Sequence, residues 1–141
     1  MERSDSYAFV YNFLMDTLGG LLDAPRARGA FALRAVMSTP WSLRDVAGSP
    51  LTLIAGVAGK LWLEPDDGDP FQIGPGDITV IRTPTHYNLA SSPATPPQFI
   101  IHPGQHCRDI NGNSMHERMM HGVRTWGNDP EGATVFLVGA Y

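Results

Sequence analysis

The sequence is short of cysteine, of lysine and of clustered positive charge. Its 141 residues include one cysteine, Cys107, which excludes a disulfide framework within the chain. The 10 lysines and arginines are scattered, Lys60 is the one lysine among them, and the formal net charge is −4. Because phosphate binding needs a concentrated basic face, we expect this chain by itself not to bind nucleic acid.

Long hydrophobic runs are missing as well. No apolar stretch is long enough to cross a bilayer, and the N-terminal segment, interrupted by Asp5, lacks the apolar core of a signal peptide. We therefore expect a cytoplasmic protein without membrane contacts. The chain is rich instead in Gly (15) and Pro (12), which predicts many turns and few long helices within one domain.

Hydrophobic periodicity predicts one short helix followed by many strands. Asp16 can cap a helix whose Leu18, Leu21 and Leu22 share one face, and Pro25 ends it. From residue 29 onward the apolar residues recur with period two or in short runs bounded by turns. The strands predicted in this way are 31–37, 51–57, 60–63, 71–73, 78–82, 87–90, 99–101 and 134–138.

The spacing of these strands predicts an all-β, antiparallel barrel or sandwich. No helix of crossover length lies between them, so a parallel sheet is not expected. Residues 103–114 are predicted to be a loop, and residues 115–121 to form one or two helical turns.

Two sets of motifs resemble known families. The corner Ile73-Gly74-Pro75-Gly76-Asp77 before the apolar strand 78–81 resembles the second-motif strand pair of the cupin superfamily, in which Gly76 permits a tight turn and Asp77 can bond backbone amides. Pro84 and His86 lie where that motif has its later Pro and His. Further blocks resemble the N-terminal domain of AraC-family transcription regulators, most specifically GVRTWGN (122–128) and LVGAY (137–141), and also 15–23, 25–31, 40–44, 94–97 and 101–105.

This resemblance implies a cupin-type, jelly-roll-like antiparallel β-barrel with a short N-terminal helix, over residues 15–141, preceded by an extension over residues 1–14. It implies a sensor or dimerisation domain, with a small-molecule effector and a second copy of the chain as partners. In that family a DNA-binding domain with two helix-turn-helix units follows the cupin. No such pattern occurs in residues 1–141, so DNA contact is expected only through a C-terminal domain that this chain lacks.

Enzymatic activity is not expected. Metal-dependent cupin enzymes carry His and Glu ligands on a first motif, whereas the corresponding strand 51–57 has no His, Glu or Asp. His86 would be the one remaining ligand, and a lone His does not hold a catalytic metal. We therefore expect no metal and no cofactor. The alternative is a stand-alone small cupin that binds a metal or a small molecule, either as a binding protein or as an enzyme.

The histidines and the cysteine leave a second question open. His102, His106 and Cys107 lie within six residues, but their spacing matches no standard zinc motif, so zinc binding there stays open. Cys107 is also a candidate redox sensor, because cationic neighbours His106 and Arg108 would lower the pKa of its thiol. The other interpretation of Cys107 is a small buried hydrophobic residue.

The candidate ligand-binding residues are Trp62, His86 and Tyr87. The strand of Trp62 and the segment of His86 and Tyr87 flank the same turn, so the three side chains are expected to converge at one barrel mouth. Such a lining would bind a planar effector that is apolar or aromatic. Core packing is the alternative interpretation, above all for Trp62.

Overall fold

The computed structural model describes residues 31–82 and 85–141. The predicted N-terminal helix, the extension over residues 1–14 and Pro84 lie outside the described residues. The elements are β1 (Phe31–Met37), β2 (Ser42–Asp45), β3 (Thr52–Ala58), β4 (Leu61–Pro65), β5 (Phe71–Ile73), β6 (Ile78–Ile81), β7 (Tyr87–Ala90), β8 (Phe99–His102), β9 (His106–Asp109), α2 (His116–Met119), β10 (Thr125–Trp126) and β11 (Thr134–Ala140).

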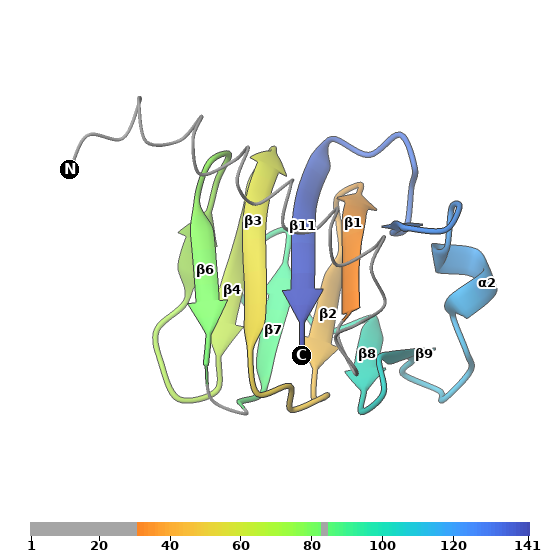
Figure 1. Cartoon of the computed structure of the whole chain (residues 1–141), viewed down its shortest axis with the longest axis horizontal. Coiled ribbons are helices and arrows are strands. Elements are labelled where there is room, and N and C mark those ends of the chain that lie inside the picture. Colours follow the sequence, from red (N-terminus) through yellow and green to blue (C-terminus); the bar gives the residue numbers. More distant parts are fainter. Residues whose placement is uncertain (1–30, 83–84) are drawn as a thin grey trace.

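These strands form two sheets that lie face to face (Figure 1). The five-stranded sheet has the order β10-β1-β11-β3-β6, and the six-stranded sheet has the order β5-β4-β7-β2-β8-β9. The all-β, two-layer architecture predicted from strand spacing is therefore confirmed. Helix α2 lies beside β9, at one side of the sandwich (Figure 1). No helix in the described ranges is both long and apolar enough to cross a membrane.

The core lies between the sheets and follows from the alternation along each strand. On β4, Leu61 and Leu63 are buried against the opposite sheet, whereas Trp62 between them is only half-buried. Strand β11 lies between β1 and β3 and is covered on both faces, which explains its almost continuous apolar sequence. The largest fully buried side chains are Trp41, Phe136, Met37, Ile54, Leu61, Ile73 and Met119.

The cupin-like corner forms as the sequence predicts. Gly76 adopts a positive φ of 86°, which a residue with a side chain would find strained. The carboxylate of Asp77 accepts a hydrogen bond from the Gly74 N–H at 2.8 Å. This corner joins β5 to β6, and so connects the edge of one sheet to the edge of the other.

Two strand pairs are parallel, which corrects the expectation of a purely antiparallel barrel. Strand β1 pairs with β10 in parallel, and β2 pairs with β8 in parallel. A parallel pair requires a long connection. Here other strands supply it, because β3 to β7 lie in the chain between β2 and β8. The absence of a crossover helix therefore does not exclude parallel neighbours in a two-sheet fold.

Three short strands were not predicted from the sequence: β2, β9 and β10. Residues 106–109 were expected within a loop, but they pair with β8, and Cys107 lies opposite Ile101. Strand β9 carries two charged residues and buries only one side chain. Its strand conformation therefore depends on pairing with β8 more than on its own hydrophobic pattern. The helical turn predicted within residues 115–121 is confirmed by α2.

Strand β10 approaches β1 closely at Gly127. This buried glycine has a φ of +150°, and its N–H donates to the carbonyl of Met119 at 2.8 Å. A Cβ at this position would collide with the backbone carbonyl of Val36 in β1. The close contact keeps Trp126, the preceding residue, in register with Ala35 of β1.

Candidate functional site

A cavity of about 760 Å³ lies between the two sheets. Strands β1 and β11 of one sheet and β2, β7, β8 and β9 of the other contribute to its wall, together with the loop 47–50 and part of α2. Most of the wall is apolar. Its apolar side chains include Leu33, Ala35, Leu43, Leu89, Ile101, Met120, Trp126, Phe136 and Val138. A space of this size suits a small organic molecule.

Strand β2 places an acidic side chain on the cavity wall. Successive residues of a strand point to opposite faces, so Leu43 and Asp45 face the cavity, while Arg44 lies on the outer face of the sheet. Asp45 pairs across the sheet with Tyr87 of β7, which also lines the cavity. The register of β2 and β7 thus brings a carboxylate and a phenol together inside the barrel.

Asp45 and Tyr87 form a hydrogen-bonded pair. The hydroxyl of Tyr87 donates to Oδ2 of Asp45 at 3.1 Å, and the N–H of Ala47 donates to Oδ1 at 2.9 Å. Burial raises the pKa of Asp45, and these two hydrogen bonds partly oppose that rise. Burial, followed by the nearby Asp45 charge, also raises the pKa of Tyr87 well above its usual range. In this pair Tyr87 is the hydrogen-bond donor, and the carboxylate of Asp45 is the acceptor.

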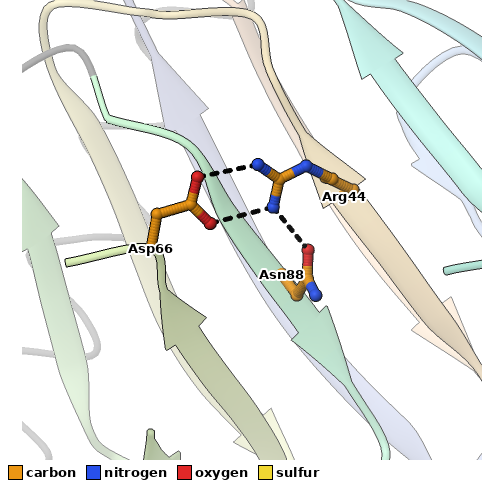
Figure 2. Close-up of polar contacts among 3 residues, drawn as sticks. All are labelled: Arg44, Asp66 and Asn88. Atoms are coloured by element: carbon orange, nitrogen blue, oxygen red, sulfur yellow. Dashed lines mark hydrogen bonds and ion pairs between the residues drawn. The ribbon is translucent and has the colours of Figure 1, made fainter. Parts of the chain in front are cut away.

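The outer face of the same strands carries an ion pair (Figure 2). Arg44 donates to both carboxylate oxygens of Asp66, at 3.0 and 2.7 Å, and to Oδ1 of Asn88 at 3.1 Å. The hydrogen bonds from Arg44 lower the pKa of Asp66. Both charged side chains are partly exposed, so the pair contributes little to stability. It does link Arg44 of β2 to Asn88 of β7 and to Asp66, the residue that follows β4.

The predicted convergence of Trp62, His86 and Tyr87 is wrong. Tyr87 lines the cavity, but Trp62 and His86 are not part of its wall. Trp62 lies on the face of β4 opposite the buried Leu61 and Leu63, because neighbouring residues of a strand alternate. His86 precedes the inward-pointing Tyr87 and is exposed, with its carbonyl accepting the N–H of Asp66 at 3.1 Å.

Cys107 lies on the cavity wall, but its thiol is not activated. Its exposed fraction is 8%, and burial raises the pKa of its thiol to about 11. The expectation that His106 and Arg108 would lower this pKa is therefore wrong, because desolvation of the thiolate dominates. Redox sensing by Cys107 stays a prediction, and a protonated thiol makes a slow nucleophile.

The three candidate zinc ligands do not gather at one point. His102 and His106 are cross-strand partners in the β8–β9 hairpin, with His106 exposed. Cys107 follows on the opposite, buried face of β9. Within residues 31–82 and 85–141, no three His, Cys, Asp or Glu side chains are close enough to hold a metal ion.

Sequence reasoning missed Asp45, the acidic side chain among the described residues that line the cavity. A signal was present, because the period-two pattern of Trp41-Ser42-Leu43-Arg44-Asp45 places Leu43 and Asp45 on the same face. The segment was passed over because Pro40 and Trp41 were taken to end the strand that precedes it. No strand was therefore predicted over residues 42–45, and Asp45 was not among the candidate site residues.

Comparison with known proteins gives one match. A family model with the description Cupin matches residues 16–141, which is most of the chain. No curated protein and no solved structure gives a significant match.

Proposed function

The chain belongs to the cupin family, and on that premise we propose that it is a ligand-sensing domain that binds a small, largely apolar molecule inside its barrel. The observation that carries this proposal is the cavity of about 760 Å³, with an apolar wall and the Asp45–Tyr87 pair. Ligand pockets typically combine such a wall with a few placed polar groups. The apolar side chains supply affinity, and the pair supplies orientation.

We propose further that the domain serves an AraC-type transcription regulator. The resemblance of the block GVRTWGN (122–128) to that family supports this role. The same block contributes Trp126 to the cavity wall, and the Arg34 N–H of β1 donates to its Arg124 carbonyl at 2.8 Å. Effector binding would thus contact the segment that carries the resemblance. The regulated DNA-binding domain would lie outside residues 1–141, and the domain would pair with a second copy.

We propose no catalytic role. Strand β3, which corresponds to the first cupin motif, contains Thr, Leu, Ile, Ala, Gly and Val and no metal-ligating side chain. A stand-alone cupin that binds a metal remains the competing function. Stoichiometric metal in the purified protein, lost in His102→Ala or His106→Ala, would favour that function over the sensor.

The cavity is tested with a neutral apolar dye, N-phenylnaphthylamine, whose fluorescence rises in apolar surroundings. We expect saturable binding to the purified chain. In Ala35→Phe the new ring points into the cavity, because Ala35 is buried and lines it, so dye binding should be lost while the protein stays folded. The matched control is Ala133→Phe, at an exposed position outside the cavity wall, which should bind dye as the parent does. Unchanged dye binding by Ala35→Phe would refute the cavity as the ligand site.

The regulatory role is tested in cells. Residues 1–141 are fused to a DNA-binding domain that is active only as a dimer, and a reporter gene measures its activity. We expect a compound that binds the cavity in vitro to change reporter activity, and we expect Ala35→Phe to abolish this change. A reporter that ignores every compound bound by the cavity would refute the sensor role and leave a binding protein.

A further inference from the structure

We propose that Asp45 makes the cavity selective for ligands that carry a protonated amine on an apolar or aromatic body. This inference rests on the function proposed above, and it specifies the chemical class of the ligand.

The carboxylate of Asp45 has acceptor capacity left over inside the cavity. An ionised carboxylate offers about four lone-pair positions for hydrogen bonds. Ala47 and Tyr87 each occupy one of them, on different oxygens of Asp45. Because Asp45 lines the cavity, its remaining acceptor positions are available to a molecule bound there.

The described part of the chain does not neutralise this carboxylate with a strong cation. Arg44 is adjacent in sequence, but it lies on the outer face and is bound by Asp66 and Asn88 (Figure 2). The exposed His86 also lowers the pKa of Asp45, but less than either hydrogen bond to the carboxylate does. Within the described residues, the inner face of the sheet therefore presents a negative group without a strong cationic partner, and a ligand cation can take that place.

The apolar surroundings of Asp45 strengthen its interaction with a cationic partner. Leu43 and Leu89, the nearest inward residues of β2 and β7, are apolar, so water screens the interaction less than it would at the surface. Burial already raises the pKa of Asp45, which shows that the ionised form lacks full compensation. A ligand ammonium group would give a charge-assisted hydrogen bond with Asp45.

The body of the ligand would extend away from Asp45 along an apolar wall. Leu33 and Val138 from the five-stranded sheet and Ile101 from the six-stranded sheet line that wall. Aromatic rings of Phe136 and Trp126 face the same space and favour an aromatic body.

The opposite preference is the main rival. His106, His116 and Arg108 also line the cavity, on the side of β9 and α2, and they would attract an anion. However, the guanidinium of Arg108 donates to the carbonyl of Gly112 at 3.0 Å, and all three residues are exposed to water. Their attraction is therefore screened more strongly than that of Asp45.

The experiment compares three probes that share one aromatic body: naphthylmethylamine, naphthylmethanol and naphthoate. Their dissociation constants are measured by isothermal titration calorimetry on the full chain. We expect the amine to bind about tenfold more tightly than the alcohol, and the carboxylate to bind most weakly. In Asp45→Asn the advantage of the amine should disappear, while the alcohol should bind as in the parent.

Two further variants make the result specific. Asp67→Asn removes an exposed carboxylate in the turn after β4, which is outside the cavity wall, and it should keep the amine preference. Asp45→Ser removes the charge but keeps a small side chain that can accept the Ala47 N–H, so it should also lose the amine preference, and it replaces Asp45→Asn if that variant folds poorly. A preference that is absent in the parent, or that survives in Asp45→Asn, overturns the inference while the proposed function stands. Failure of all three probes to bind the parent overturns both.

Discussion

Replacement of Gly127 by alanine tests how the cavity wall is built. Gly127 has a φ of +150°, and a Cβ there would collide with the carbonyl of Val36. Val36 belongs to β1, which is paired with both β10 and β11, so its backbone cannot move aside without breaking a sheet. The substitution therefore combines an unfavourable φ with overpacking against fixed backbone.

The two costs can be separated by a matched control. Gly122 has a φ of +99° and nothing within 4 Å of an added Cβ, so Gly122→Ala incurs backbone strain alone. That strain costs about 1–3 kcal/mol, and it is common to both variants. Overpacking adds about 1–3 kcal/mol to Gly127→Ala. For a domain of this size the difference corresponds to a Tm about 4–12 °C lower than that of Gly122→Ala.

Differential scanning calorimetry of the two variants measures this difference. A second readout is dye binding, because displacement of β10 would also displace Trp126 and disturb the cavity wall. We expect Gly127→Ala to bind N-phenylnaphthylamine more weakly than Gly122→Ala does. If both variants melt at the same temperature and bind dye equally, the close approach of β10 to β1 is refuted.

Three further predictions concern other side chains of the site. Cys107 should react with iodoacetamide about 100-fold more slowly at neutral pH than a thiol of pKa 9.0, because burial raises its pKa to about 11. Mass spectrometry after timed quenching measures the rate, and reaction at the rate of a free cysteine would contradict the burial of the thiol. Trp62→Ala should leave dye affinity unchanged, because Trp62 is half-buried and lies outside the cavity wall. For the same reason it should lower the free energy of unfolding, measured with urea, by less than the ~3–5 kcal/mol lost when a core tryptophan is replaced by alanine. The pKa of Asp45 in the folded state is above 3.8, so the folded state binds the proton of this carboxyl group more tightly than the unfolded state does. The contribution of Asp45 to stability therefore falls as pH rises from 3.8 to the raised pKa. Relative to the parent, Asp45→Asn should therefore gain Tm as pH rises through this interval, and parallel Tm–pH curves for the two proteins would show that the Asp45 pKa is not raised.

The strands with a clear period-two pattern or a long apolar run could be predicted from the sequence. The apolar run 51–57 corresponds to β3, and the alternation in 31–37 corresponds to β1. The pattern of these two strands can be recognised because one whole face of each strand is buried, so that its inward positions are apolar. The corner at Gly76 and Asp77 could be predicted as well, because this turn depends on the positive φ of Gly76 and on a hydrogen bond to the nearby Asp77 carboxylate.

The parts of the site that were missed depend on information that is not local. In Leu61-Trp62-Leu63 both faces are apolar, so alternation cannot show which face meets the other sheet, and Trp62 was assigned to the interior. Asp45 presents the reverse case, because a half-buried carboxylate that faces inward contradicts the usual pattern of an inward position. The alternation in residues 41–45 puts Asp45 on the face of Leu43, but its pairing with Tyr87 comes from the register of β2 and β7, which no short segment of sequence reveals.

The central position of β11 has a consequence for how the chain is made. This strand comes last in the described chain, yet it lies between β1 and β3, with which it pairs along nearly its whole length. During synthesis on the ribosome, β1 and β3 therefore emerge before their shared neighbour. Each keeps one edge without a hydrogen-bonded partner until residues 134–140 have been made. Open strand edges are prone to pair with other chains. A nascent or truncated chain that stops before Thr134 should consequently aggregate, whereas loss of a strand at the edge of a sheet, such as β5, leaves the inner pairings intact.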